Sequence, residues 1–168
     1  ARDIGFLADA GPDPNGTMSD FDCDGLSDAE EFVGGTNPAA ADSDGDGLSD
    51  GLEMGRTSAV AGTSCAFIGD ADPASTTNPN SRDSDGDHID DGLEDRNHDG
   101  SVQADELDPN DTDTDNDGLS DETEDQNRDG VRELNETDGT RADTDADGIP
   151  DGLEDRNHNG VRDVGETD

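Results

Sequence analysis

The chain has 168 residues, a formal net charge of −39 and only 25% hydrophobic residues, among them four Phe and neither Trp nor Tyr. Such a composition cannot bury enough apolar surface to offset the entropy of ordering the chain, and self-repulsion favours expansion unless cations bind. A large hydrophobic core is therefore excluded. A nucleic-acid partner is excluded as well, because phosphate contacts need basic patches. No apolar run is long enough for a membrane span.

Residues 1–19 form a separate segment, with Ile4, Phe6 and Leu7 ahead of a stretch rich in Pro and Gly. The apolar residues are a weak strand signal, and the Pro and Gly residues prevent a helix in the second half. We expect a cap over the first loop or, alternatively, a strand lent to a neighbouring subunit. Because the sequence lacks an initiator Met and a signal peptide, we interpret it as a processed protein or a fragment of a longer array.

Carboxylates then recur at positions 1, 3, 5, 9 and 12 of two twelve-residue loops, residues 20–31 and 42–53. Gly at position 6 permits a sharp turn, and position 7 offers its peptide carbonyl. This is the spacing by which a loop wraps a calcium ion. A random acidic tract lacks such order, so the sequence predicts a fold built around cations instead of a disordered polyacid.

Residues 54–82 interrupt this pattern with Val60, Cys65, Phe67 and Ile68, the main apolar cluster of the chain. Apolar residues gathered in one segment favour local packing over a calcium loop. We expect a short hairpin or a cap in this insert.

From residue 83 the loops return in pairs with a 30-residue period. The pairs are residues 83–94 with 95–106, 113–124 with 125–136, and 143–154 with 155–166. Self-similarity at this period indicates a linear array in which each unit contacts mainly its neighbours. The predicted units are therefore an N-terminal segment (1–19), a first pair of loops (20–53), the insert (54–82) and three double-loop repeats (83–166).

Regular secondary structure should be sparse. Pro38, Pro79 and Pro109 stand four residues before a loop and stiffen the spacers. The recurrent Gly-Leu-Glu at positions 10–12 predicts at most a helical turn, at residues 51–53, 92–94 and 152–154.

The predicted metal ligands share one plan: side-chain oxygens at positions 1, 3, 5, 9 and 12, and the carbonyl of position 7. They are Asp20, Asp22, Asp24, Leu26, Asp28, Glu31, Asp42, Asp44, Asp46, Leu48, Asp50, Glu53, Asp83, Asp85, Asp87, Ile89, Asp91, Glu94, Asp95, Asn97, Asp99, Ser101, Gln103, Glu106, Asp113, Asp115, Asp117, Leu119, Asp121, Glu124, Asp125, Asn127, Asp129, Val131, Glu133, Glu136, Asp143, Asp145, Asp147, Ile149, Asp151, Glu154, Asp155, Asn157, Asn159, Val161, Asp163 and Glu166. Many hard oxygen ligands favour Ca²⁺ over Mg²⁺, which retains waters, and over zinc, which prefers His or Cys. We expect about eight calcium sites.

The loops fall into two grades. The Asp loops, which begin at residues 20, 42, 83, 113 and 143, have five carboxylates each. The Asn loops, which begin at 95, 125 and 155, have Asn at position 3 and fewer carboxylates. Since fewer carboxylates give weaker sites, we expect loop 155–166 to release calcium before loop 143–154. His88 replaces the position-6 Gly of loop 83–94.

The repeated Asp-x-Asp-x-Asp-Gly-x-x-Asp-x-x-Glu pattern over residues 20–53 and 83–166 resembles the thrombospondin type 3 repeat in its bacterial form. The resemblance implies an irregular, elongated, calcium-stabilised array with little regular secondary structure, no large hydrophobic core and an extracellular location. EF-hands match less well, because they carry an apolar residue at position 8 and long flanking helices, whereas position 8 here is Ser27, Ser49, Asp90, Ser120 or Pro150. Dockerin modules would place helices between the loops.

Cys23 and Cys65 could pair, because an extracellular location is oxidising, and such a bridge would hold the insert on the first loop. Two free thiols are the alternative. Asn15, Asn110 and Asn135 begin Asn-x-Thr sequons, which are either glycosylation sites or chance in so Asn- and Thr-rich a chain.

His88, His98 and His158 stand at loop positions 4 or 6 and are interpreted as solvated. Every Asp pair follows the metal spacing, and no nucleophile group, phosphate loop or cofactor motif occurs, so we expect no enzyme. The leading hypothesis is an extracellular, calcium-rigidified rod or stalk, or the subunit of a surface filament, whose partners are calcium, other copies of itself or a surface partner. The alternatives are an adhesion or glycan-binding module and a calcium-dependent spacer of a larger secreted enzyme.

Overall fold

The computed structural model describes residues 19–134 and 136–160. The predictions for residues 1–18, for Asn135 and for residues 161–168 lie outside these ranges. They concern the N-terminal cap or strand, the sequons at Asn15 and Asn135, and the ligands Val161, Asp163 and Glu166.

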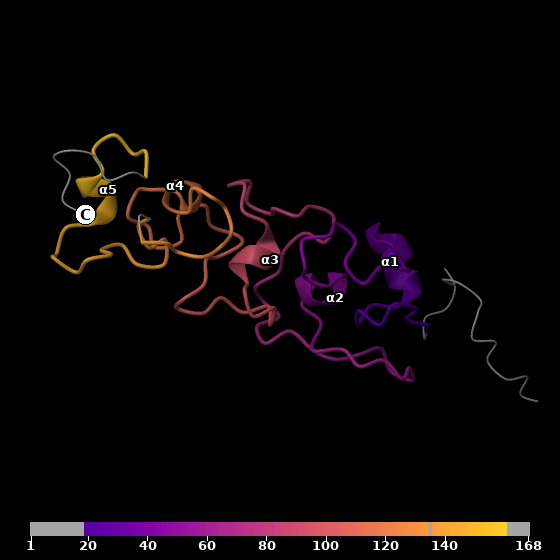
Figure 1. The fold of residues 1–168 in the computed structure, drawn as a ribbon. Coiled ribbons are helices and arrows are strands. Elements are labelled where there is room, and N and C mark those ends of the chain that lie inside the picture. The colour runs from indigo at the N-terminus through magenta and orange to yellow at the C-terminus, as the bar shows by residue number, and fades with distance from the viewer. Residues whose placement is uncertain (1–18, 135, 161–168) are drawn as a thin grey trace, which may run out of the picture.

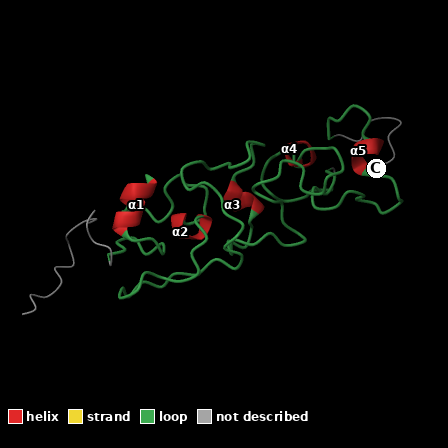
Figure 2. Cartoon of the chain, turned by 180° about the vertical axis from the view of Figure 1, so that it is seen from behind, coloured by secondary structure: helices red, strands yellow, loops and turns green. Residues whose placement is uncertain are grey.

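The described residues contain five short helices and no strand. The helices are α1 (Asp28–Gly34), α2 (Asp50–Glu53), α3 (Asp91–Glu94), α4 (Asp121–Glu124) and α5 (Asp151–Glu154). Figure 1 shows them following one another in chain order from one end of the molecule to the other, and the view from behind in Figure 2 shows the same order. The sparse regular structure agrees with the sequence prediction, and helical turns also form at α1 and α4, where Gly-Leu-Glu is absent.

Each helix begins at position 9 of an Asp loop, where acidic residues in the first turn favour the helix N-terminus. Four of the helices end at position 12, after a single turn. α1 is longer because it has a capping box: Ser27 Oγ accepts from the Glu30 amide at 3.3 Å, and Glu30 Oε2 accepts from the Ser27 amide at 2.9 Å. Gly35, with φ 88°, ends it.

The loops are shaped by left-handed backbone at two positions. Position 6 has positive φ in all eight loops, including His88 at 82°. Position 4 has positive φ in all eight as well, although it is Gly only in loops 42–53 and 83–94 and is otherwise a residue such as Cys23, Arg128 or Ala146. Such residues adopt this region only at a cost. The sequence indicated the turn at position 6 but not the one at position 4.

The apolar interior is a thin line of side chains. Buried apolar residues in the described part are Leu26, Leu48, Leu52, Ile89, Leu107 and Leu119. Four of them occupy position 7 of an Asp loop, so the residue whose carbonyl is a predicted ligand also supplies the core. A large hydrophobic core is absent from the described residues, in agreement with the composition.

Successive Asp loops meet at close backbone joints. A Cβ added to Gly51 would lie 1.9 Å from the carbonyl oxygen of Asp24, and one added to Gly92 would lie 2.5 Å from that of Asp46. Gly152 has the same relationship to Asp117, at 2.5 Å. At these three joints the helical turn of an Asp loop therefore packs on position 5 of the preceding Asp loop, and position 10 must be Gly for so close a contact to form. Loop 113–124 differs, because its position 10 is Glu122.

The insert folds back on the first loop. The Asp70 amide donates to the Arg56 carbonyl at 2.7 Å, so the chain doubles back between these residues in a hairpin-like excursion without strands. Its Phe67 ring covers Gly25, where an added Cβ would lie 2.8 Å from the ring. The insert thus acts both as a hairpin and as a cap.

No helix in the described ranges has the length and apolar content needed to cross a membrane.

Candidate calcium sites

Backbone amides hold the loop carboxylates in place. At position 5, one oxygen of Asp24, Asp46 or Asp87 accepts from the amide of position 7 at 2.7–2.8 Å. At position 1, Asp42 and Asp83 accept from the amide of position 6 at 3.1 and 3.0 Å. At position 5 the second oxygen of each carboxylate has no hydrogen-bond partner. Asp42 and Asp83 use both oxygens for the loop, because Oδ1 of each also accepts from the amide of position 4 at 2.6 Å.

Many carboxylate oxygens of the loops are buried but have no hydrogen-bond partner. Buried carboxylate oxygens without a hydrogen-bond partner are Asp20 Oδ2, both of Asp22, Asp24 Oδ2, both of Glu31, Asp44 Oδ2, Asp46 Oδ2, Glu53 Oε2, Asp85 Oδ2, Asp87 Oδ2, both of Glu94, Asp115 Oδ2 and both of Glu124. All of these come from positions 1, 3, 5 and 12 of Asp loops, and Asp70 Oδ2 of the insert is a further oxygen of the same kind. Buried oxygens of this kind are rare in proteins because an unmet carboxylate is strongly destabilising.

The pKa values of these groups reflect the same crowding. Burial, together with the charges of Asp87 and Asp85, raises the pKa of Glu94 to about 10. Burial likewise raises the pKa of Glu53 to about 9 and that of Glu124 to about 9. Protein groups alone do not stabilise these carboxylates in their ionised form.

The residues present fit calcium. Loop 20–31 contributes six unpartnered buried oxygens, from Asp20, Asp22, Asp24 and Glu31, and the carbonyl of Leu26 would be a seventh ligand. Calcium takes six to eight oxygen ligands in flexible geometry. The carboxylates of Asp20, Asp22 and Asp24 have oxygens within 4.8 Å of one another, as do those of Asp42, Asp44 and Asp46. Oxygens bound to one ion at 2.3–2.6 Å are separated by at most about 5 Å.

Position 9 differs from the other predicted ligand positions. Asp50 accepts from the Ser43 amide at 2.8 Å and from the Ser43 hydroxyl at 2.7 Å, both at position 2 of the same loop. Asp91 has the same two bonds from Ser84, at 2.8 and 2.6 Å. The position-9 carboxylate therefore closes its own loop.

In the Asn loops, the ligand positions bond to one another. Gln103 Nε2 donates to Asp99 Oδ1 at 3.1 Å and to the Ser101 carbonyl at 2.7 Å, and Asn127 Nδ2 donates to Glu133 Oε2 at 3.0 Å. In the described residues of loops 95–106 and 125–136, no buried carboxylate oxygen lacks a partner. This contrast follows the two grades that the sequence predicts.

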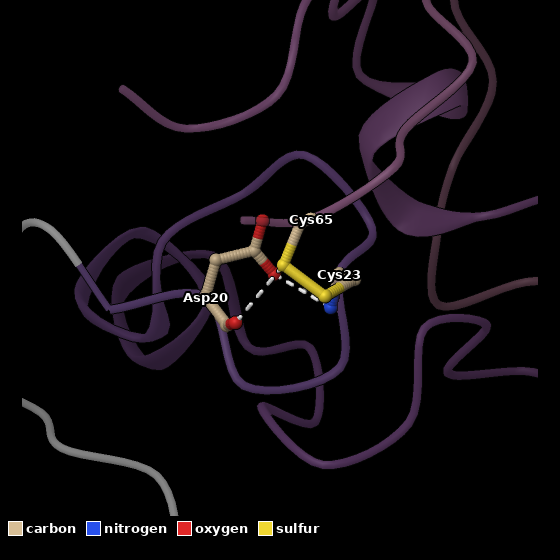
Figure 3. A group of neighbouring side chains, drawn as sticks. All are labelled: Asp20, Cys23 and Cys65. Carbon is tan, nitrogen blue, oxygen red and sulfur yellow. Dashed lines mark hydrogen bonds between the residues drawn. A yellow bond between two sulfur atoms is a disulfide. The ribbon is translucent and has the colours of Figure 1, made fainter. Parts of the chain in front are cut away.

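Figure 3 shows the first loop with its disulfide. Cys23 and Cys65 are joined, with an S–S distance of 2.01 Å, as the sequence analysis allowed. The Cys23 amide donates to Asp20 Oδ1 at 2.7 Å (Figure 3). Cys65 Sγ lies 3.5 Å from the Asp20 carbonyl oxygen, and because the bonded sulfur has no proton, this is a van der Waals contact. Neither sulfur is a thiolate metal ligand while the bridge is intact.

Several residues at the sites were not singled out by their spacing. Asp70 in the insert is 6% exposed, has an unpartnered Oδ2 and lies against Gly100 of loop 95–106. His98 Nε2 lies 3.1 Å from the Gly92 carbonyl, and His158 Nδ1 lies 3.2 Å from the Gly118 carbonyl. These exposed histidines therefore reach Asp loops, a contact that their loop positions did not indicate.

Of the three Asn-x-Thr sequons, the one at Asn110 lies within the described residues, and its Asn side chain is exposed.

Fold and loops together define a class: a repeat protein of acidic loops shaped to enclose cations. The family model of the bacterial TSP3 repeat matches residues 20–41, 42–54 and 113–127. The chain therefore contains bacterial TSP3 repeats, and the resemblance drawn from its sequence is confirmed. TSP3 repeats are calcium-binding modules and are typically extracellular. No curated protein matches the chain, and no solved structure matches it either.

Proposed function

We propose that this protein is an extracellular, calcium-rigidified structural element, a rod or stalk, with a structural and not a catalytic role. The observation that carries the proposal is the set of buried position-12 glutamates. Glu31, Glu94 and Glu124 are at most 1% exposed, and neither oxygen of any of them has a hydrogen-bond partner. A bound cation supplies the missing partner.

Calcium takes the part that a hydrophobic core plays in other proteins. Each ion brings two positive charges into a chain of net charge −39 and turns the repulsion among buried carboxylates into attraction. Because a preformed site does not exist in the unfolded chain, the binding free energy stabilises the folded state. The order of α1 to α5 along the chain supports an elongated array (Figure 1).

An extracellular setting suits both stabilising features. Calcium modules of extracellular proteins work at high calcium concentrations, with dissociation constants of about 10⁻⁴–10⁻³ M. Disulfides such as Cys23–Cys65 persist in oxidising compartments. A rod of this kind serves as a spacer on a cell surface or, by end-to-end association, as the subunit of a filament.

Small-angle scattering and circular dichroism with excess calcium, with magnesium and after chelation test this function. We expect a defined rod in calcium, an expanded flexible chain after chelation, and little recovery with magnesium, whose octahedral shell is smaller. Unchanged dimensions on chelation would contradict the proposal.

A matched pair of variants within α4 locates the effect. Glu124→Gln removes a buried, unpartnered carboxylate, whereas Glu122→Gln removes the same charge from a side chain that pairs with Arg128. Native mass spectrometry at limiting calcium should show one ion fewer for Glu124→Gln and the parent count for Glu122→Gln. Equal losses would mean that charge alone, and not the site, controls binding.

A further inference from the structure

The position-9 aspartates lie between two loops. Asp50 closes its own loop through Ser43, but its carboxylate also has an oxygen within 4.8 Å of oxygens of Asp24 and Glu31, positions 5 and 12 of the preceding Asp loop. The group Asp24, Glu31 and Asp50 is entirely buried, whereas Asp42, at position 1 of the same loop as Asp50, is half-buried.

The next joint repeats this arrangement. Asp91, held in its own loop by Ser84, has a carboxylate oxygen within 4.8 Å of oxygens of Asp46 and Glu53. These are again positions 5 and 12 of the preceding Asp loop, although the 29-residue insert separates the two loops in sequence. The relationship is therefore set by the stacking of loops and not by their distance along the chain.

Contacts between loops extend the stacking to the remaining joints. Glu122, next to Asp121 in α4, lies 3.2 Å from His88 of loop 83–94. At the last joint the Gly152 amide, next to Asp151, donates to Asp117 Oδ2 at 2.5 Å, which fixes α5 against loop 113–124.

A cluster of acids alone would not identify a ligand site, but position 12 supplies independent evidence. Glu31 is 0% exposed, and both of its oxygens lack partners while facing Asp24 and Asp50. A hydrogen bond to a carboxylate oxygen leaves it a further lone pair for a metal. Asp50 can therefore bind Ser43 and an ion of the preceding loop together.

We propose that each calcium site in the Asp loops is completed from the next Asp loop, whose position-9 aspartate is a shared ligand. Asp50 completes the site of loop 20–31, Asp91 that of loop 42–53, Asp121 that of loop 83–94 and Asp151 that of loop 113–124. This inference rests on the proposed calcium binding and adds which residues hold each ion. The shared ligand also clamps successive loops together, so filling one site orders the loop that follows.

Loop 143–154 is less covered than the other Asp loops in the described residues. Its Asp145, Asp147 and Ile149 are exposed, whereas the matching Asp87 and Ile89 of loop 83–94 are buried. Loop 143–154 therefore binds calcium most weakly among the Asp loops.

Hydrogen exchange of the full chain over a calcium series tests the shared ligand, with separate peptides for residues 20–31 and 42–53. The variant is Asp50→Asn, in which Oδ1 can still accept from the Ser43 amide and Nδ2 can donate to the Ser43 hydroxyl, while the charge is lost. We expect the calcium concentration for half-protection of peptide 20–31 to rise about tenfold or more, with a smaller shift for peptide 42–53. Asp91→Asn should move the effect by one loop, to peptide 42–53.

Two controls separate a shared ligand from a local role. Asp90→Asn removes the carboxylate next to Asp91, which pairs with Arg82 and is not a predicted ligand, so it should leave the half-protection of peptides 20–31 and 42–53 unchanged. Ser43→Ala removes the hydroxyl of the same loop but keeps the carboxylate, so it should affect peptide 42–53 more than peptide 20–31. A shift confined to peptide 42–53 in Asp50→Asn overturns the shared ligand alone. No calcium-dependent protection anywhere in the parent overturns the proposed function as well.

Discussion

Glu122 Oε2 lies 3.2 Å from His88 Nδ1, across the joint between loops 83–94 and 113–124. At this joint position 6 of the upstream loop is His and position 10 of the downstream loop is Glu, whereas at the other three joints both are Gly. Arg128 also pairs with Glu122. Side chains here take over the role of close backbone packing, which explains why His88 is accommodated at a position that otherwise requires Gly.

Because of this difference, alanine at position 10 should cost more stability at a Gly joint than at the joint with Glu122. Gly51→Ala would place a Cβ 1.9 Å from the Asp24 carbonyl oxygen, so the joint must open, and overpacking of this kind costs about 1–3 kcal/mol. Glu122→Ala keeps a Cβ that the joint already holds and should cost no more than about 1 kcal/mol, the value of an exposed ion pair. Denaturant unfolding in excess calcium measures both. A harmless Gly51→Ala would show that the joint is loose.

The stability of the calcium-free chain should fall as pH rises. Burial holds the pKa of Glu94 near 10 and those of Glu53 and Glu124 near 9, above the value of about 4.3 for an unfolded Glu. A raised folded-state pKa contributes stability that is complete below the unfolded pKa and is lost as pH rises through the folded pKa. The calcium-free fold should therefore weaken progressively between about pH 4 and pH 10.

Scattering from metal-free protein checks this prediction. The radius of gyration should be smaller at about pH 5 than at pH 8. With calcium the order reverses, because the ion needs deprotonated carboxylates and its affinity falls on acidification. A calcium-free chain that is more compact at pH 8 than at pH 5 would contradict the assignment of these glutamates as buried and repelling.

The Asn loops allow a test by gain of affinity. Loop 125–136 has carboxylates at positions 1, 5, 9 and 12, and Asn127→Asp would add the fifth. The new carboxylate would lose the bond from Asn127 Nδ2 to Glu133 Oε2 and direct a charged oxygen to the ion. We expect about tenfold tighter calcium binding, read as protection of peptide 125–136. Asn116→Asp makes the same change at position 4 of the neighbouring loop 113–124, which is not a ligand position, and should leave peptide 125–136 unaffected.

Much of this molecule follows from its spacing, and the remainder depends on contacts between loops. The period of Asp, Gly and Glu identified the loops, the helical turns at α2, α3 and α5, and the two grades. Single loops could not show that Gly51 packs on Asp24, because this contact joins residues from different repeats. Asp70 was missed for a related reason, since it stands outside any loop and reaches Gly100 only through the fold of the insert.

The disulfide should stabilise the N-terminal end of the array beyond what calcium provides. Cys23 and Cys65 are 42 residues apart, and closing a loop of this length is worth about 4 kcal/mol in the chain-entropy account. In excess calcium, Cys23→Ser with Cys65→Ser should therefore lower the unfolding free energy by about this amount and release Phe67 from Gly25, so that peptide 56–70 loses exchange protection. Chemical reduction of the parent should give the same result. If the double variant keeps the parent's denaturation midpoint, packing of the insert, and not the bridge, holds it on the first calcium loop.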